Sequence, residues 1–243
     1  DTATIGFSNL TGGSRVLFAS ALVVTESTNQ VIDILKDRAS KIWNIDKEAR
    51  EWENGEARPA GDNAGKVTPL SLVELAEQAT PTGGPIGAGH QVNTVGAEGG
   101  FATHICDVEV DIELGIARVI RYTAAQDVGK AIHPAYVEGQ LQGGVVQGIG
   151  WALNEEYIYN KEGKLDNPGF LDYRIPVCSD LPMIDTILVE VPNPQHPQGV
   201  RGVGEVPIVP PLSAIANAIY NAIGTRFYSL PMSPPKVLEK ISD

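Results

Sequence analysis

The run Arg201-Gly202-Val203-Gly204-Glu205 contains the carboxylate of this sequence that is best placed for acid–base chemistry. Its glycines let the backbone bend sharply, so that a substrate can come close to the Glu205 side chain. A carboxylate in the first turn of a helix can also be explained by the helix dipole alone. The apolar helix that follows is expected to begin only at Pro210-Pro211, which weakens that explanation and favours a chemical role for Glu205.

A second candidate is a glycine-rich helix, which the sequence predicts from about Tyr136 to Tyr157. Each glycine costs an interior helix position about 1 kcal/mol relative to alanine, so its repeated use needs a compensating reason. One reason is the close approach of a flat ligand, whose polar edge could bind neighbouring carboxamides, since an amide both donates and accepts. The other is tight packing against a sheet, and both interpretations stay open. The residues concerned are Gly139, Gly143, Gly144, Gly148, Gly150, Gln140, Gln142 and Gln147.

The third candidate is the loop Thr11-Gly12-Gly13-Ser14-Arg15, which precedes a helical pattern. Its backbone amides and the dipole of the following helix could hold a phosphate, with Arg15 adding positive charge. Short Gly-Gly loops before helices are mostly simple turns. The pattern by itself therefore favours a turn.

Hydrophobic spacing predicts the elements that position these residues. Apolar residues from Val16 to Ile42 recur at roughly helical intervals and predict one long helix or two shorter ones. Asn54-Gly55 predicts a hairpin turn, and Thr68 followed by Pro69 predicts the start of a short helix. The glycine-rich segment from Thr82 to Gly100 has no apolar period and predicts a long loop.

Strands dominate the expected elements of the second half. Alternating apolar and polar residues predict a two-stranded hairpin of Cys106–Asp111 and Ala117–Tyr122, and further strands are expected at Phe170–Ile175 and Thr186–Val191. An apolar stripe predicts a helix from Pro210 that closes at Gly224. Strands and helices mix without a regular βαβ rhythm, so the predicted class is α+β, with mixed sheets packed against helices. The 243 residues form one domain or two subdomains, about 1–100 and 101–243.

The composition argues against several classes of function. The formal charge is −12, the pI is near 4.8 and no basic run occurs, so binding to nucleic acid is not expected. No apolar stretch approaches the roughly 20 residues of a membrane span, and no signal peptide is recognisable, so we expect a cytoplasmic protein without a membrane partner. Cys106 and Cys178 lack disulfide or zinc spacing and are expected to be reduced core thiols. The four histidines share no ligand spacing.

Together these motifs resemble the end of the large subunit of molybdenum hydroxylases, the xanthine dehydrogenase and aldehyde oxidase family. The resemblance covers nearly the whole chain, from about Thr11 to the C-terminus, and implies the C-terminal half of a molybdopterin-binding region. The segments that carry it, in matching order and spacing, are Thr11–Arg15, Asp127–Gly129, Gly139–Gly148, Phe170–Pro176, Gly202–Glu205 and Leu230–Pro234.

The resemblance implies a role for each candidate residue. Glu205 would lie beside the metal as the catalytic base, and Gln140 would contact the pterin. No protein side chain is expected to ligate molybdenum, because the dithiolene of the pterin holds it in such enzymes. The implied cofactor is molybdopterin or its cytosine dinucleotide form. Its pyrophosphate, or the oxygen side of the metal, would contact Gly13, Ser14 and Arg15, and the same cofactor site would include Gly12 and Gly204.

The implied reaction is hydroxylation of an aldehyde or an N-heterocycle carbon with oxygen from water. Electrons would pass to iron–sulfur clusters and FAD on partner chains. The expected partners are therefore the N-terminal half of the large subunit, an iron–sulfur subunit and an FAD subunit, and the chain alone should be catalytically incomplete. Two alternatives stay open: a non-catalytic cofactor-binding or scaffold subunit with a structural Glu205, and an unrelated hydrolase in which Glu205 activates water.

Overall fold

A computed structural model of the chain describes residues 3–48, 50–94 and 99–242. By their contacts these residues form two compact units. The smaller unit is Ala19–Thr94, and the larger one combines the residues up to Phe18 with those from Gly99 onward. This division differs from the expected subdomains, 1–100 and 101–243, in its placement of the first residues. Gly13 and Ser14 share a unit with Glu205.

The smaller unit is built around α1 (Arg15–Trp43), a single continuous helix. The first turn of this helix, up to Phe18, belongs to the larger unit. Leu35 and Ala39 of this helix are buried against Ala57 and Leu75. Strands β1 (Arg50–Glu53), β2 (Glu56–Pro59) and β3 (Leu70–Ser71) form an antiparallel sheet. The turn between β1 and β2 falls at Asn54-Gly55, where both residues have positive φ, and confirms the predicted hairpin.

The short helix predicted at Thr68 begins later in the structure. After the short 3₁₀ turn η1 (Gly61–Asn63), Thr68 leads into β3, and α2 (Leu72–Glu77) starts after Ser71. The Ser71 side chain accepts a hydrogen bond from the Glu74 amide, while the Glu74 carboxylate accepts one from the Ser71 amide at 2.8 Å. This reciprocal capping box satisfies two amides that the first helical turn leaves without partners. The prediction that Thr68 caps the helix was therefore wrong.

The larger unit contains the predicted hairpin of β4 (Ala102–Asp111) and β5 (Ile116–Asp127). Strand β6 (Ile184–Val189) pairs parallel with β5 and confirms the strand expected at Thr186–Val191, with slightly earlier bounds. A register shift in the hairpin adds one residue to β5, so Val119 and Tyr122 are both buried although they are three residues apart.

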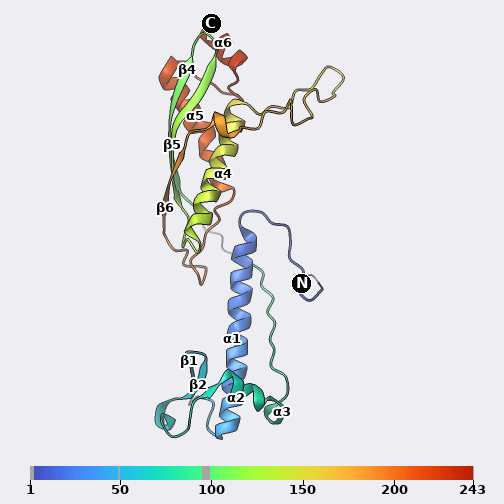
Figure 1. Cartoon of the computed structure of the whole chain (residues 1–243), viewed down its shortest axis with the longest axis vertical. Coiled ribbons are helices and arrows are strands. Elements are labelled where there is room, and N and C mark those ends of the chain that lie inside the picture. The colour runs from blue at the N-terminus through green and yellow to red at the C-terminus, as the bar shows by residue number, and fades with distance from the viewer. Residues whose placement is uncertain (1–2, 49, 95–98, 243) are drawn as a thin grey trace. The chain divides into compact units, whose positions relative to one another are not determined.

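Helices α4 (Pro134–Leu153) and α5 (Val209–Ile223) pack against each other and against this sheet (Figure 1). Helix α4 ends before the predicted Tyr157, and α5 ends at Gly224 in the left-handed region, as predicted. A last helix, α6 (Pro234–Ser242), was not predicted and buries Val237. Helices packed on mixed sheets confirm the α+β class. The core consists of Val119, Tyr122, Ala124, Val145, Ile149, Ala152, Leu153, Ile184, Ile215, Ile219, Met232 and Val237.

Two further sequence predictions were wrong. Residues 170–173 form a turn and a bend, and residues 174 and 175 have no regular structure, because no neighbouring strand pairs with them in the described structure; Phe170 is fully exposed. Cys178 begins the short 3₁₀ helix η2 (Cys178–Asp180) and is exposed, whereas only Cys106 is partly buried; both cysteines are free thiols.

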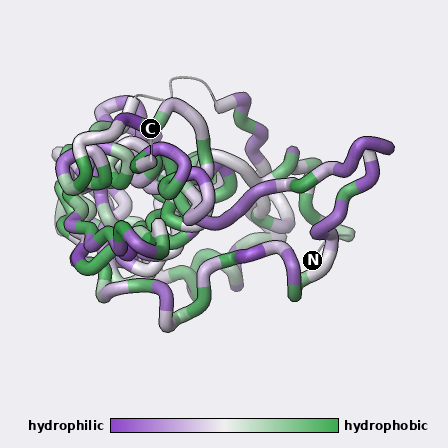
Figure 2. Tube along the Cα trace, turned by 90° about the horizontal axis from the view of Figure 1, so that it is seen from above, coloured by the Kyte–Doolittle hydropathy of each residue, from purple (hydrophilic) through white to green (hydrophobic). Residues whose placement is uncertain are grey.

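One apolar segment is longer than the sequence analysis expected. Among the described residues, Val206–Ile223 has the length and hydropathy of a helix that could cross a membrane. This is weak evidence, because Ile215 and Ile219 of the segment are fully buried in the core of the larger unit. Along the Cα trace, hydrophobic and hydrophilic residues alternate in short runs (Figure 2).

Candidate active site

Glu205 meets the N-terminal loop in the folded chain. Its Oε2 atom accepts a hydrogen bond from the Gly13 amide, with a nitrogen–oxygen distance of 2.6 Å. The side chain of Glu205 is exposed. Gly13 has a φ of 59°, in the left-handed region that glycine enters without steric cost. This conformation aims the Gly13 amide at the carboxylate, so one carboxylate oxygen is fixed while the side chain stays open to a ligand.

Ser14 holds the backbone on the other side of the same turn. Its hydroxyl oxygen accepts hydrogen bonds from the amides of Val203 at 2.9 Å and Gly204 at 3.2 Å. Ser14 itself has a φ of 57°, which is uncommon for a residue other than glycine. The strained loop is therefore stabilised by its contacts with the segment that carries Glu205.

Gln140 lies beside Gly204. A Cβ atom added at Gly204 would lie 3.2 Å from Gln140 Oε1, which it would crowd, and 3.7 Å from Ser14 Oγ, an ordinary contact distance. Gln140 is exposed near the start of α4. Of the predicted site residues, Gly13, Ser14, Gln140, Gly204 and Glu205 thus come together in space.

The other two predicted site residues have different contacts. The Gly12 carbonyl accepts from the Arg15 amide at 3.1 Å and closes the turn before α1. The Arg15 guanidinium donates to Ser8 Oγ and to the Asn9 carbonyl, both at 3.4 Å. These contacts connect Arg15 to the preceding N-terminal residues, and its role at a phosphate stays a prediction.

Several glycines of α4 are explained by packing. A Cβ atom at Gly144 would lie 2.6 Å from Pro207 Cγ, and one at Gly148 would lie 2.7 Å from Pro211 Cβ. Pro207 belongs to the short 3₁₀ helix η3 (Val206–Ile208), directly after Glu205. At Gly144 and Gly148 the close approach expected along this helix is therefore made by η3 and the start of α5, and not by a sheet. In contrast, a Cβ at Gly139 or Gly143 would meet nothing within 4 Å.

His196, one of the four histidines without ligand spacing, has a structural role near the site. It is almost completely buried, and its Nδ1 accepts from the Gln198 amide at 3.2 Å. Nε2 therefore carries the proton and donates to the Phe18 carbonyl at 3.0 Å. The imidazole also packs on the Phe18 ring, with centroids 4.3 Å apart. His196 thus joins the loop before Arg201 to the first turn of α1, a long-range contact that has no local sequence signal.

The described residues contain no group of three or more His, Cys, Asp or Glu side chains arranged to hold a metal ion. A cavity of about 700 Å³ lies between β5, the end of α4 and residues 179–182, and none of the predicted site residues lines it. The Glu205 side chain is exposed, and Gly202, Val203 and Gly204 before it are half-buried.

Comparison with known proteins relates this chain to a family. Residues 1–182 match the molybdopterin cofactor-binding domain. A putative xanthine dehydrogenase molybdenum-binding subunit of Escherichia coli (strain K12) is 37% identical over 175 residues, which cover 70% of this chain and 23% of that protein. The carbon monoxide dehydrogenase large chain of Hydrogenophaga pseudoflava is 24% identical over 248 aligned positions, which cover 100% of this chain and 31% of that protein.

A solved structure extends the likeness to the fold. Quinoline 2-oxidoreductase from Pseudomonas putida 86 superposes with a TM-score of 0.83 at 26% identity, over 96% of this chain and 31% of that one. The chain spans between 23% and 31% of the length of these relatives. Because the family match covers well over half of the residues, the chain belongs to the molybdopterin cofactor-binding domain family and is a molybdopterin-binding region of the molybdenum hydroxylase type.

Proposed function

We propose that this chain forms part of the active site of a molybdenum-dependent oxidoreductase, with Glu205 as the catalytic base. The observation that carries the proposal is the Glu205 turn. An exposed carboxylate is oriented by the Gly13 amide at 2.6 Å, beside the exposed carboxamide of Gln140. Ser14 joins the N-terminal loop to the residues before Glu205, since its hydroxyl accepts from the amides of Val203 and Gly204. A base needs this combination of a fixed orientation and an open approach.

The residues present fit a pterin cofactor. Gln140 offers both a donor and an acceptor to the polar edge of a flat ring. Gly204 has no side chain to block that approach, since a Cβ there would crowd Gln140 Oε1. Gly12, Gly13, Ser14 and Arg15 lie immediately before or at the start of α1, whose dipole favours a pyrophosphate. The Gly13 amide itself donates to Glu205. We therefore assign the pterin edge to Gln140 and Gly204, and the pyrophosphate to the loop that ends at Arg15.

The proposed reaction hydroxylates an aldehyde or an N-heterocycle carbon with oxygen from water. When bound, the molybdenum–pterin group supplies the two-electron oxidation of that carbon. Glu205 takes the proton that the water-derived oxygen loses as it forms its bond to the substrate. Because Oε2 already accepts the Gly13 amide, we place this proton on Oε1. The two electrons leave through iron–sulfur clusters and FAD on partner chains.

Replacing the charged carboxylate of Glu205 with a neutral amide tests its role as the base. We expect Glu205→Gln in the assembled complex to keep its molybdenum and to lower turnover by about 10²-fold to 10⁴-fold, the range for loss of a general base. Glu113→Gln, an exposed substitution in the turn between β4 and β5, is the matched control and should keep full turnover. Molybdenum is measured by mass spectrometry, and turnover with an artificial electron acceptor. Full activity of Glu205→Gln would assign the chain to the non-catalytic cofactor-binding alternative.

The proposed partners cover apolar surface that the chain leaves open. The sheet face opposite the helices exposes Ile105, Ile120 and Ile187, each by more than half, and the turns at Phe170 and Leu171 are over 90% exposed. Such a concentration of exposed apolar side chains is typical of a protein interface. We propose that the N-terminal half of the large subunit covers it. Expressed alone, the chain should hold little molybdenum; with that half, it should form a stable complex that holds the metal and turns over substrate.

A further inference from the structure

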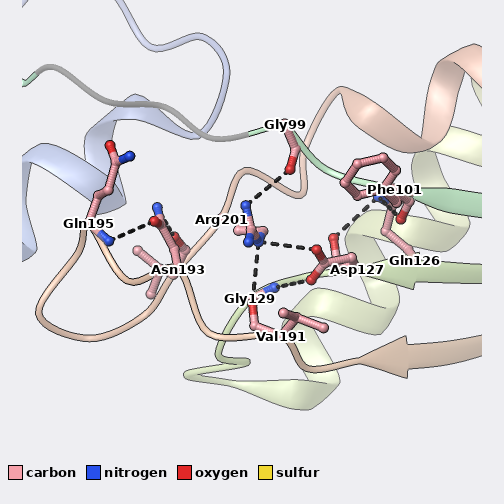
Figure 3. Close-up of polar contacts among 10 residues, drawn as sticks. Gly99, Phe101, Gln126, Asp127, Gly129, Val191, Asn193, Gln195 and Arg201 are labelled. Atoms are coloured by element: carbon pink, nitrogen blue, oxygen red, sulfur yellow. Dashed lines mark hydrogen bonds and ion pairs between the residues drawn. The ribbon is translucent and has the colours of Figure 1, made fainter.

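The side chain of Arg201 is largely buried, four residues before Glu205 and directly after the isolated bridge between Val200 and Gly129. Its side chain is 9% exposed, and the side chain of its ion-pair partner Asp127 is 8% exposed. Figure 3 shows the Arg201 guanidinium between Gly99, Asp127 and Val191. Taking two opposite charges out of water is costly unless their geometry is good, so stability alone does not explain why this ion pair is buried.

The contacts of Arg201 join the ends of three strands. Nε lies 3.1 Å from Asp127 Oδ2, in the last residue of β5, and donates to the Val191 carbonyl, just after β6, at 3.3 Å. Nη1 donates to the Gly99 carbonyl, shortly before β4, at 3.0 Å. The planar fork of an arginine fixes the directions of such bonds in a way that a lysine cannot. The guanidinium therefore sets the position of Arg201 relative to the whole sheet.

Asp127 is held in turn by the backbone beside it. Its Oδ1 accepts from the Gly129 amide at 3.0 Å, and Gly129 forms an isolated antiparallel bridge with Val200. Gly129 has a φ of 63°, and a Cβ atom there would lie 2.8 Å from the Arg201 nitrogen. Backbone and side chain of Arg201 thus both dock on the Asp127–Gly129 corner.

The Glu205 segment is anchored on both sides by these contacts. Arg201 fixes its beginning, and Pro207 packs on Gly144 at its end. Only Gly202, Val203 and Gly204 lie between Arg201 and Glu205, and Ser14 accepts from two of their amides. A rotation of the Arg201 side chain would therefore be passed to the carboxylate through a short, hydrogen-bonded segment.

We propose that the Arg201–Asp127 ion pair is a positioning device that sets the place of the Glu205 carboxylate, an inference that rests on Glu205 acting as the base. Misplacing a catalytic group by about 1 Å can cost about 10²-fold in rate. In the assembled complex, Arg201→Lys and Asp127→Asn should each lower kcat per bound molybdenum about 10-fold to 100-fold. KM and molybdenum content should stay within about twofold, since a positioning residue touches neither substrate nor cofactor.

A double variant separates positioning from general structural damage. If Asp127 acts through Glu205, then Asp127→Asn combined with Glu205→Gln should be no slower than Glu205→Gln alone, because effects of groups that act as a unit do not add. Lys130→Met is the matched control. It removes the exposed Lys130–Glu190 ion pair next to the same corner and should leave kcat unchanged.

Each result has one meaning for the proposal. Losses that multiply in the double variant, or unchanged kcat in both single variants, would overturn the positioning role while Glu205 stays the base. Loss of molybdenum or of assembly in both single variants would assign the pair to folding and would overturn it as well. Full activity of Glu205→Gln alone would instead overturn the proposed function on which the inference rests.

Discussion

Replacing Gly144 with alanine should displace Glu205 by way of Pro207. The added Cβ atom would lie 2.6 Å from Pro207 Cγ and 3.0 Å from its Cβ. Carbon atoms in contact are about 3.5 to 4.0 Å apart, so the two backbones must separate by roughly 1 Å. Pro207 cannot move alone, because the Ile208 amide donates to the Glu205 carbonyl at 3.1 Å within the same 3₁₀ turn. The displacement therefore reaches the carboxylate.

The expected losses of stability and of turnover are unequal. Overpacking costs about 1 to 3 kcal/mol, and alanine returns about 1 kcal/mol of helix propensity, so the free energy of unfolding should fall by at most about 2 kcal/mol. A shift of about 1 Å at the base should lower turnover by as much as about 10²-fold. The variant Gly144→Ala should thus be folded, loaded with molybdenum and slow.

The assay compares kcat per bound molybdenum with the thermal unfolding midpoint of the complex. Gly115→Ala is the control, because its Cβ would lie 2.8 Å from Leu238 Cγ, far from Glu205 in the turn between β4 and β5, where φ is 70°. It should lower the midpoint and leave kcat unchanged. If Gly144→Ala turned over as fast as the parent complex, or if Gly115→Ala lost as much kcat, the coupling between Pro207 and Glu205 would be refuted.

Three further outcomes are expected. Ser14→Ala removes the hydroxyl that accepts from the amides of Val203 and Gly204, and it should lower kcat per bound molybdenum in steady-state assays. A kcat equal to that of the parent complex would show that the hydroxyl does not hold the turn. Burial, with the charge of Asp107, raises the pKa of Cys106 to about 12, so iodoacetamide should alkylate the exposed Cys178 first, as peptide mass spectrometry would show. Burial lowers the pKa of His104 from 6.5 to about 4, so the folded state binds this proton at a lower pH than the unfolded state does. The stability that the neutral imidazole contributes above pH 6.5 is therefore lost as the pH falls towards 4. His104→Gln, which cannot titrate, should flatten that part of the pH dependence in denaturant titrations.

Local patterns in the sequence predicted most elements of the fold. The helical period from Val16 to Ile42 and the closing residue Gly224 are short-range signals, and both were confirmed. The error at Thr68 arose because a better cap, Ser71 with Glu74, follows three residues later. The prediction of a strand at Phe170–Ile175 was wrong, because β-forming residues make a strand only where a neighbouring strand offers backbone partners.

The candidate site was predicted in part, because its residues carry distinctive types. Glu205 is a carboxylate flanked by glycines, and Gln140 is a carboxamide on a glycine-rich helix. Ser14 belongs to a turn before a helix, so each of the three residues has a recognisable local pattern. The residues that hold them, Arg201 and His196, have no such local signature. The Val191 and Phe18 carbonyls that they contact are backbone atoms that any residue type supplies. Asp127, the ion-pair partner of Arg201, lies far away in the sequence, so no local pattern marks these contacts.

The hydrogen bond between Gly13 and Glu205 joins residues 192 positions apart, which sets a time order for the assembly of the site. At about 5 to 20 residues per second, a ribosome needs roughly 10 to 40 s to synthesise the intervening chain. Throughout that interval, the Gly13 amide and the Ser14 hydroxyl cannot form the contacts that they make with residues 203–205 in the folded chain. A ligand that requires both the N-terminal loop and the Glu205 carboxylate must therefore bind after synthesis has passed Glu205. A nascent chain stalled before Arg201 lacks the Glu205 carboxylate and cannot form the site.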